Sequence, residues 1–263
     1  MIELFDTHAH LNDPSLLKLG AGLFESAAEA QVTRMMAIGI DLKSSLQCVE
    51  IAEKNEHVFA SAGVHPNSSH QCNEHRWKEV LELFKRPKVV AIGECGLDRY
   101  WDDCPLDIQK QWFVKQIVLS HENGLPLVVH MRESEQEILD AFAGNHDSGK
   151  VHGIMHSFTG SWETAQTCLD YGMYISFAGM VTFKNAQAIR DVAKQVPADR
   201  ILIETDAPYL TPEPHRGKRP NHPALVQHTA QCLADLRGQS LEEFAAQTTA
   251  NALRVFKFAD DSI

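Results

Sequence analysis

The chain has 263 residues, of which 44% are hydrophobic and 22% charged; this is enough apolar material for a sizeable core and too much for a disordered chain. The formal net charge of −11 argues against a broad basic face that grips long nucleic acid, although a small pocket for an anionic substrate is compatible with it. No segment approaches the roughly 18–20 apolar residues of a membrane span and no basic leader is present. We therefore expect a soluble cytoplasmic protein whose six scattered cysteines are reduced thiols.

Short apolar segments alternate with amphipathic ones along the whole chain. This alternation predicts parallel strands joined by crossover helices. The eight predicted strands are residues 2–6, 34–40, 57–63, 88–94, 125–130, 151–156, 173–177 and 200–204. We expect them to close into a (β/α)8 barrel, an α/β TIM barrel formed by one domain over residues 1–263. A doubly wound open sheet is the alternative.

Two helices and one long loop are marked by residue spacing. Segment 77–84 has apolar residues at i, i+3, i+4 and i+7, the stripe of a helix that packs on a core. Ser240 and Glu243 form a capping box that begins a helix over 241–255. Four more prolines or glycines interrupt segment 208–223, which predicts an irregular loop, and a loop of this length is usually functional.

Side chains that can bind metals stand at the carboxyl ends of the predicted strands. In a barrel these ends meet at one mouth, so residues far apart in sequence can share a pocket. The spacing of His8 and His10 places both imidazoles on one side of an extended strand. The candidate residues are His8, His10, His65, Glu94, His130, His156 and Asp206.

Two carboxylates in this set have distinct expected roles. Glu94 lies between Gly93 and Cys95-Gly96, and its two oxygens could bridge two metals. Asp206 could both bind a metal and accept a proton from the attacking water. Two cations about 3.5–4 Å apart are the usual arrangement for phosphodiester hydrolysis. Glu94 and Asp206 are therefore the predicted catalytic residues.

Basic side chains near these strand ends indicate an anionic substrate. Arg132 comes two residues after His130, and Arg216, Lys218 and Arg219 crowd the irregular loop. Guanidinium groups match the geometry of phosphate oxygens. A solvated charge cluster is the alternative for the loop residues. Asn221 and His222 close the same loop without an assigned role.

The motifs taken together resemble the TatD family of metal-dependent deoxyribonucleases, which belongs to the amidohydrolase superfamily. The matching segments are Asp6-Thr7-His8-Ala9-His10-Leu11, Gly63-Val64-His65-Pro66, Ile92-Gly93-Glu94-Cys95-Gly96-Leu97-Asp98, His130 with Arg132, His156-Ser157-Phe158-Thr159-Gly160, Glu204-Thr205-Asp206-Ala207-Pro208-Tyr209 and Gly217-Lys218-Arg219. They cover nearly the whole chain in order, and their combination is highly specific.

The resemblance implies a function and a division of roles. It implies hydrolysis of DNA, acting on single strands or from an end, with two divalent ions that could be zinc, manganese, magnesium or nickel. One ion would be held by His8, His10, Glu94 and Asp206, and the second by Glu94, His130 and His156. His65 and Arg132 would contact substrate phosphate, and Asp206 would act on the nucleophilic water.

One departure and two alternative functions accompany this prediction. After Arg219 the chain has Pro220-Asn221-His222-Pro223, where the family usually has Asn-Glu-Pro, so the contacts of this loop and the substrate preference could differ. A hydrolase of a small amide, lactone or phosphoester would use the same chemistry. A non-catalytic metal-binding scaffold is the third possibility, against which the complete ligand set argues. No membrane or obligatory protein partner is indicated.

Overall fold

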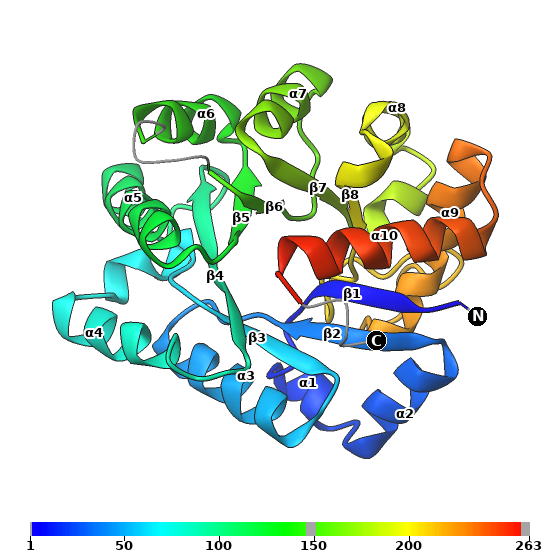
Figure 1. Ribbon diagram of the computed structural model, residues 1–263, viewed down its shortest axis with the longest axis horizontal. Coiled ribbons are helices and arrows are strands. Elements are labelled where there is room, and N and C mark those ends of the chain that lie inside the picture. Colours follow the sequence, from blue (N-terminus) through cyan, green and yellow to red (C-terminus); the bar gives the residue numbers. More distant parts are fainter. Residues whose placement is uncertain (1, 146–150, 259–263) are drawn as a thin grey trace.

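Eight parallel strands stand side by side in one sheet, in the order in which they occur along the chain (Figure 1). The computed structural model describes residues 2–145 and 151–258; residue 1, residues 146–150 and residues 259–263, which the expected 1–263 domain includes, lie outside this description. The strands are β1 (Leu4–Ala9), β2 (Val32–Ala37), β3 (Val58–Ala62), β4 (Val89–Asp98), β5 (Leu127–Arg132), β6 (Gly153–Met155), β7 (Met173–Phe177) and β8 (Ile201–Ile203).

The first and last strands of the sheet meet. Ala9 at the end of β1 bridges Ala207, which follows β8, and the amide of His10 donates to the carbonyl of Ala207 at 2.8 Å. The Thr7 hydroxyl in β1 donates to the carbonyl of Ile203 in β8. The predicted barrel is therefore confirmed, and the alternative of an open doubly wound sheet is wrong.

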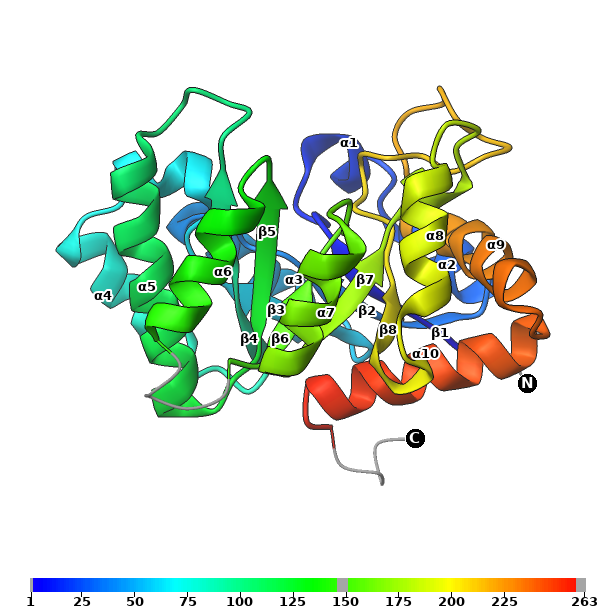
Figure 2. The same ribbon diagram turned by 90° about the horizontal axis from the view of Figure 1, so that it is seen from above.

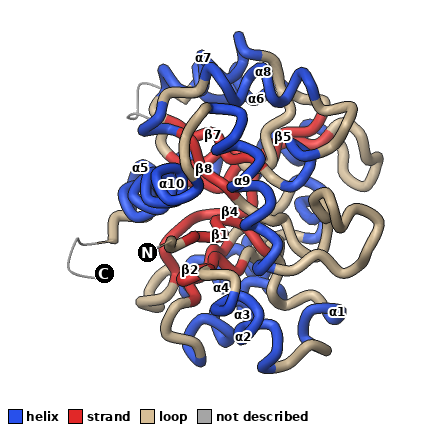
Figure 3. Tube along the Cα trace, turned by 90° about the vertical axis from the view of Figure 1, so that its right-hand side faces the viewer, coloured by secondary structure: helices blue, strands red, loops and turns tan. Residues whose placement is uncertain are grey.

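Helices surround this barrel (Figures 1 and 3). The α-helices are α1 (Pro14–Leu17), α2 (Ala21–Glu29), α3 (Leu42–Lys54), α4 (Glu74–Leu83), α5 (Leu106–Asn123), α6 (Glu135–Gly144), α7 (Trp162–Tyr171), α8 (Gln187–Gln195), α9 (Val226–Arg237) and α10 (Leu241–Val255). Short 3-10 helices are η1 (Pro66–Gln71), η3 (Gly179–Thr182), η4 (Ala198–Arg200) and η5 (Pro223–Leu225). Among the described residues, none of the helices combines the length and apolar character needed to cross a bilayer.

The described residues form two apolar cores, and the smaller one covers one end of the barrel. The larger core lies between strands and surrounding helices. The smaller one contains barrel residues such as Phe5, Met36 and Val128 together with Val255 and Phe256 at the end of α10. Helix α10 thereby lies across the amino-terminal end of the strands, while the loops after β1, β4 and β8 rise at the opposite end (Figure 2). The mouth is therefore at the carboxyl ends.

The structure confirms the predicted helices and shifts some strand ends. Segment 77–84 lies in α4 with Phe84 as its C-cap, and α10 begins after the Ser240 capping box as predicted. Strand β1 continues past its expected end at residue 6 to Ala9, and β4 continues past Glu94 to Asp98. The extension of β4 arises because Cys95–Asp98 pair with Val129–Arg132 of β5. An apolar pattern that stops at Glu94 does not reveal this pairing.

Candidate metal centre

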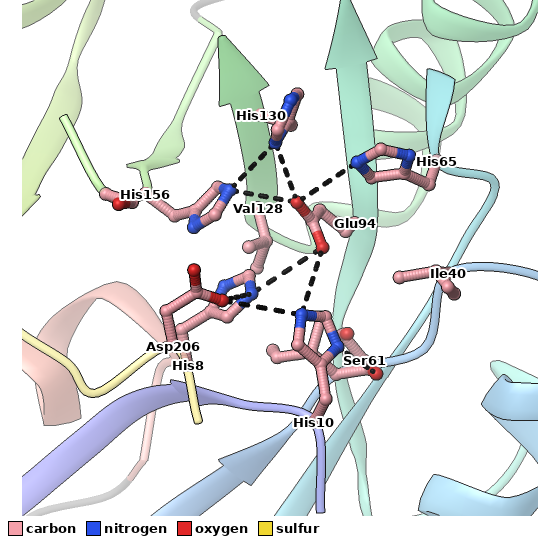
Figure 4. A network of polar contacts seen from close by, with 12 residues as sticks. His8, His10, Ile40, Ser61, His65, Glu94, Val128, His130, His156 and Asp206 are labelled. Carbon is pink, nitrogen blue, oxygen red and sulfur yellow. Dashed lines mark hydrogen bonds and ion pairs between the residues drawn. The ribbon is translucent and has the colours of Figure 1, made fainter. Parts of the chain in front are cut away.

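Glu94 lies at the centre of the predicted cluster (Figure 4). Its side chain is only 3% exposed. Its Oε1 lies 3.1 Å from Nδ1 of His130 and 2.9 Å from Nε2 of His156. Its Oε2 lies 3.6 Å and 3.8 Å from Nε2 of His8 and His10. The two imidazoles nearest Oε1 therefore come from β5 and the segment after β6, and the two that face Oε2 come from β1 and the residue that follows it.

Asp206 approaches the cluster from the other side of the barrel seam. Its Oδ1 lies 3.6 Å from Nε2 of His8 and 3.4 Å from Nε2 of His10. Buried Asp6 braces this juncture, because its Oδ1 accepts the amides of Thr205 at 2.8 Å and His8 at 3.3 Å. With 14% of its side chain exposed, Asp206 is more open to the mouth than Glu94. Closure of the barrel thus brings residue 206 beside residues 8 and 10.

In three histidines the outer nitrogen, meaning the ring nitrogen that points away from Glu94, donates a hydrogen bond to an oxygen. His130 donates from Nε2 to Asp98 Oδ2 at 3.0 Å, and His156 donates from Nδ1 to Glu204 Oε1 at 3.3 Å. His10 donates from Nδ1 to the carbonyl of Ile38 at 3.4 Å. In the neutral ring, with the proton on the outer nitrogen, the inner nitrogen would present its lone pair to a cation in the cluster. This is the arrangement that orients metal-binding imidazoles.

His65 is arranged in the opposite way. Its Nδ1 accepts the backbone amide of Asn67 at 3.1 Å, so the proton of the neutral ring lies on Nε2. That Nε2 is directed at Glu94 Oε1, 3.5 Å away. Burial lowers the pKa of His65 to about 3, which keeps the ring neutral. His65 therefore offers a hydrogen-bond donor to the mouth, whereas neutral His10, His130 and His156 would offer lone pairs.

The buried polar atoms of the cluster fit divalent cations. Both nitrogens of His8 are buried and have no hydrogen-bond partner among the described residues, which is costly unless a ligand satisfies them. His8 Nε2 faces the carboxylates of Glu94 and Asp206, and Nδ1 of His130 lies 3.2 Å from Nε2 of His156. Three groups of ligand atoms lie within 4.8 Å of one another: His8, Glu94 and His156; His8, His10 and Asp206; and His65, Glu94 and His130.

The electrostatics of the cluster keep its carboxylates ionised. Burial alone would raise the pKa of Glu94, but attraction to the charge of His156 and the hydrogen bonds from His130 and His156 lower it well below its usual value. Burial would likewise raise the pKa of Asp206, yet the hydrogen bond and charge of His10 lower it. Burial by itself would lower the pKa of His156, and the charge of Glu94 raises it well above the usual value. A bound cation would take the place of such imidazolium protons.

The predicted basic residues are exposed to solvent, unlike the buried and half-buried residues of this cluster. Arg132 is exposed beyond His130, and its guanidinium stacks on Tyr100. The other three basic residues, Arg216, Lys218 and Arg219, are exposed on the 208–223 loop. The guanidinium of Arg216 lies over the ring of Phe183, and Lys218 contacts His215.

Asn221 and His222 close that loop, and the structure separates their surroundings. Asn221 is fully buried, and its Nδ2 donates to the carbonyls of Thr205 at 2.9 Å and Tyr209 at 2.6 Å. This fastens the loop to the segment that carries Asp206. The Nδ1 of His222 is buried without a hydrogen-bond partner among the described residues.

Sequence reasoning missed the carboxylates behind the histidines. Asp98 is 2% exposed and Glu204 is fully buried, and each accepts a hydrogen bond from one imidazole. The charge on Asp98 is stabilised: burial would raise its pKa, but the hydrogen bond from His130 lowers it to about 2. Glu204 offered one signal, because it stands two residues before Asp206. Asp98 closes one of the matching motif segments, but its position behind His130 depends on the pairing of β4 with β5.

Comparison with known proteins identifies the family of the chain. The family model described as TatD related DNase matches residues 5–257. The chain is 42% identical to an uncharacterized metal-dependent hydrolase, YabD, of Bacillus subtilis over 97% of this chain and 99% of the relative. It is 32% identical to the 3′-5′ ssDNA/RNA exonuclease TatD of Escherichia coli over 97% and 100% of the two chains.

A solved structure gives the same result for the fold. The crystal structure of YJJV, a TatD homologue from Escherichia coli, superposes with a TM-score of 0.90 at 26% identity, covering 97% of this chain and 98% of the other. Together with the match of the family model, these similarities show that the chain belongs to the TatD-related DNase family and is a metal-dependent hydrolase.

Proposed function

We propose that the chain hydrolyses phosphodiester bonds of DNA with two divalent cations held at the mouth of the barrel. His8, His10 and Asp206 would hold one ion, His130 and His156 would hold the other, and Glu94 would contact both. The observation that carries the proposal is the position of Glu94, whose two oxygens face separate pairs of imidazoles. Imidazole-rich ligation suits zinc, manganese or nickel, whereas magnesium prefers oxygen ligands.

The residues around the ions divide the remaining work. Divalent ions in such a site polarise a phosphoryl oxygen and make water more acidic. Asp206 would accept the proton of the attacking water, because its lowered pKa leaves it ionised and its side chain reaches the mouth. His65 would donate a hydrogen bond from Nε2 to a phosphate oxygen. Its neutral state and the hydrogen bond that its Nδ1 accepts from the Asn67 amide favour this role. Arg132 would bind a phosphate through its guanidinium.

The substrate is expected to be single-stranded DNA cleaved from an end. The exonuclease name of the Escherichia coli relative supports this preference. The net charge of −11 means that attraction of the substrate must come from the mouth itself rather than from the field of the whole molecule. Arg216, Lys218 and Arg219 on the 208–223 loop would add positive charge beside it.

Substitution of Asp206 tests this function. Asp206→Asn should retain the fold and most bound metal but hydrolyse a single-stranded oligonucleotide about 10²–10⁴-fold more slowly, because the amide accepts a proton poorly. Asp199→Asn, an exposed carboxylate in η4, is the matched control. Metal content by atomic emission and turnover with added zinc or manganese are measured together. Unchanged turnover would remove Asp206 from the mechanism, and wild-type preference for lactones or cyclic amides over DNA would contradict the proposed substrate.

A further inference from the structure

Two aromatic side chains stand exposed on the loop that joins β4 to α5. Tyr100 is 49% exposed and Trp101 is 50% exposed. Their rings meet edge to face, with centroids 4.9 Å apart. The loop that carries them rises above the carboxyl ends of the strands, at the same end of the barrel as the mouth (Figure 2). Large aromatic side chains exposed to solvent beside a catalytic site often mark a place where a ligand binds.

Arg132 adds a positive charge to these rings. Its guanidinium carbon lies 3.9 Å from the ring centroid of Tyr100 and 5.7 Å from that of Trp101. Nearby Arg99 is paired with Glu137 at 2.8 Å, whereas Arg132 has no ion pair within the described residues. The guanidinium is therefore held by the rings and remains available to an anion. An aromatic pair with an unneutralised arginine matches both parts of a nucleotide, its base and its phosphate.

A single carboxylate connects this surface to the metal-ligand cluster. Asp98 Oδ1 accepts the backbone amides of Tyr100 at 2.8 Å and Trp101 at 3.2 Å. Its Oδ2 accepts from Nε2 of His130 at 3.0 Å. Asp98 is also the backbone register partner of Arg132 in the β4–β5 ladder. The aromatic pair, the arginine and a metal-binding imidazole are thus fixed to one buried group.

We propose that Tyr100, Trp101 and Arg132 form a stacking platform for an unpaired nucleobase next to the phosphate being hydrolysed. The proposal rests on the DNA hydrolysis proposed above and assigns the choice of single strands to named residues. Base–aromatic stacking tolerates every base, because each base has a π face. In a duplex the bases are already stacked and paired, so only an unpaired or splayed base can reach Trp101. Arg132 would hold the adjoining phosphate.

The test compares substrates with and without bases. One single-stranded oligonucleotide carries normal bases, and the other carries abasic residues at its terminal positions, so both present the same phosphates. Trp101→Ala should raise KM for the normal strand about 5- to 100-fold, with a smaller effect on kcat. Trp101→Phe should restore most of the affinity. On the abasic strand, wild type should already show the raised KM, and Trp101→Ala should add no further loss.

A control and a second measurement separate stacking from other effects. Leu46→Ala removes an exposed apolar side chain from α3 and should leave both substrates unaffected. A dinucleoside methylphosphonate, which is neutral and resists hydrolysis, should quench the fluorescence of the metal-loaded wild type but not that of Trp101→Phe. An unchanged KM in Trp101→Ala, or equal losses on both strands, would overturn the platform. Failure of wild type to cleave either strand would instead contradict the proposed function, while the fluorescence measurement would still test the platform.

Discussion

At the level of single residues, the division of labour among the histidines depends on what each outer nitrogen contacts. Three oxygen groups each accept a hydrogen bond from one imidazole: the carboxylates of Asp98 and Glu204 and the carbonyl of Ile38. The Asn67 amide instead donates to His65. Under the proposed function, residues of one type in one cluster would thereby serve either to bind cations or to donate a hydrogen bond. We expect substitution of His65 to leave metal binding largely unchanged, because its role is toward the substrate.

Removal of a supporting carboxylate should weaken metal binding without removing a ligand. Asp98→Asn should reduce metal affinity about 10-fold and Asp98→Ala up to about 100-fold, because His130 loses the acceptor that orients its ring. Competition with a chromophoric chelator measures the affinity. Asp103→Asn, on the same loop and exposed, is the control. Equal metal affinities in Asp98→Ala and wild type would show that Asp98 does not position His130.

The site residues could be predicted to different depths from the sequence. His8, His10 and Asp206 were accessible because each stands at the end of an apolar segment, where parallel strands converge. The role of Asp98 was not, because it depends on four residues of β4 beyond Glu94 that pair with β5. The orientation of His65 was equally hidden, since it arises from a backbone amide two residues later. Residue type indicates a possible ligand, and only the surroundings determine which nitrogen is offered.

At the level of elements, the pairing of β4 with β5 that places Glu94 beside His130 leaves no room for a side chain at position 96. Gly96 has φ of +123°, and a Cβ there would lie 2.0 Å from the carbonyl oxygen of His130. These two residues are partners in the β4–β5 ladder. Any side chain at position 96 would push against the strand that carries a predicted ligand.

Gly96→Ala should therefore lower both stability and metal binding. We expect a loss of about 1–3 kcal/mol in the free energy of unfolding from the steric overlap, together with weaker binding at His130. Gly144→Ala is the matched control: it ends α6, and apart from its chain neighbours a Cβ there meets no atom of the described residues within 4 Å, so the stability should be unchanged or slightly higher. Urea unfolding and chelator competition measure the two effects. Wild-type values in Gly96→Ala would contradict the close approach.

The elements themselves were predicted best where a local signal marks their ends. The capping box of Ser240 and Glu243 fixed the start of α10, and both of its hydrogen bonds form. The ends of β1 and β4 were set by partner strands, so a pattern within one segment could not locate them. The irregular 208–223 loop was recognised from its prolines and glycines. Its attachment through buried Asn221 is a tertiary contact with residues 205 and 209.

At the level of the whole molecule, the cluster exists only when the barrel closes. Its members come from segments separated by almost the full length of the chain, and the seam between β1 and the residues after β8 joins Asp206 to His8 through a backbone hydrogen bond of 2.9 Å. An unfolded chain therefore has no comparable site. Ligands that bind only the folded state stabilise it by mass action.

Removal of the ions should lower thermal stability. Each ion present at about 100 times its dissociation constant contributes about 2.7 kcal/mol, or about 5 kcal/mol for both, so chelation of both ions should reduce Tm by roughly 10–20 °C. Differential scanning calorimetry of the chelated protein, followed by addition of zinc or manganese, measures the loss and its recovery. A Tm that is insensitive to chelation in a protein shown to have contained metal would mean that the ions do not bind the closed barrel preferentially.

The central claim is that six side chains from distant parts of the chain hold two cations through one shared carboxylate. Anomalous diffraction from crystals grown with manganese or zinc tests it most directly. The account predicts two peaks, one bonded to His8, His10 and Asp206 and the other to His130 and His156, with Glu94 bonded to both. A single peak, or two peaks of which only one contacts Glu94, would contradict it.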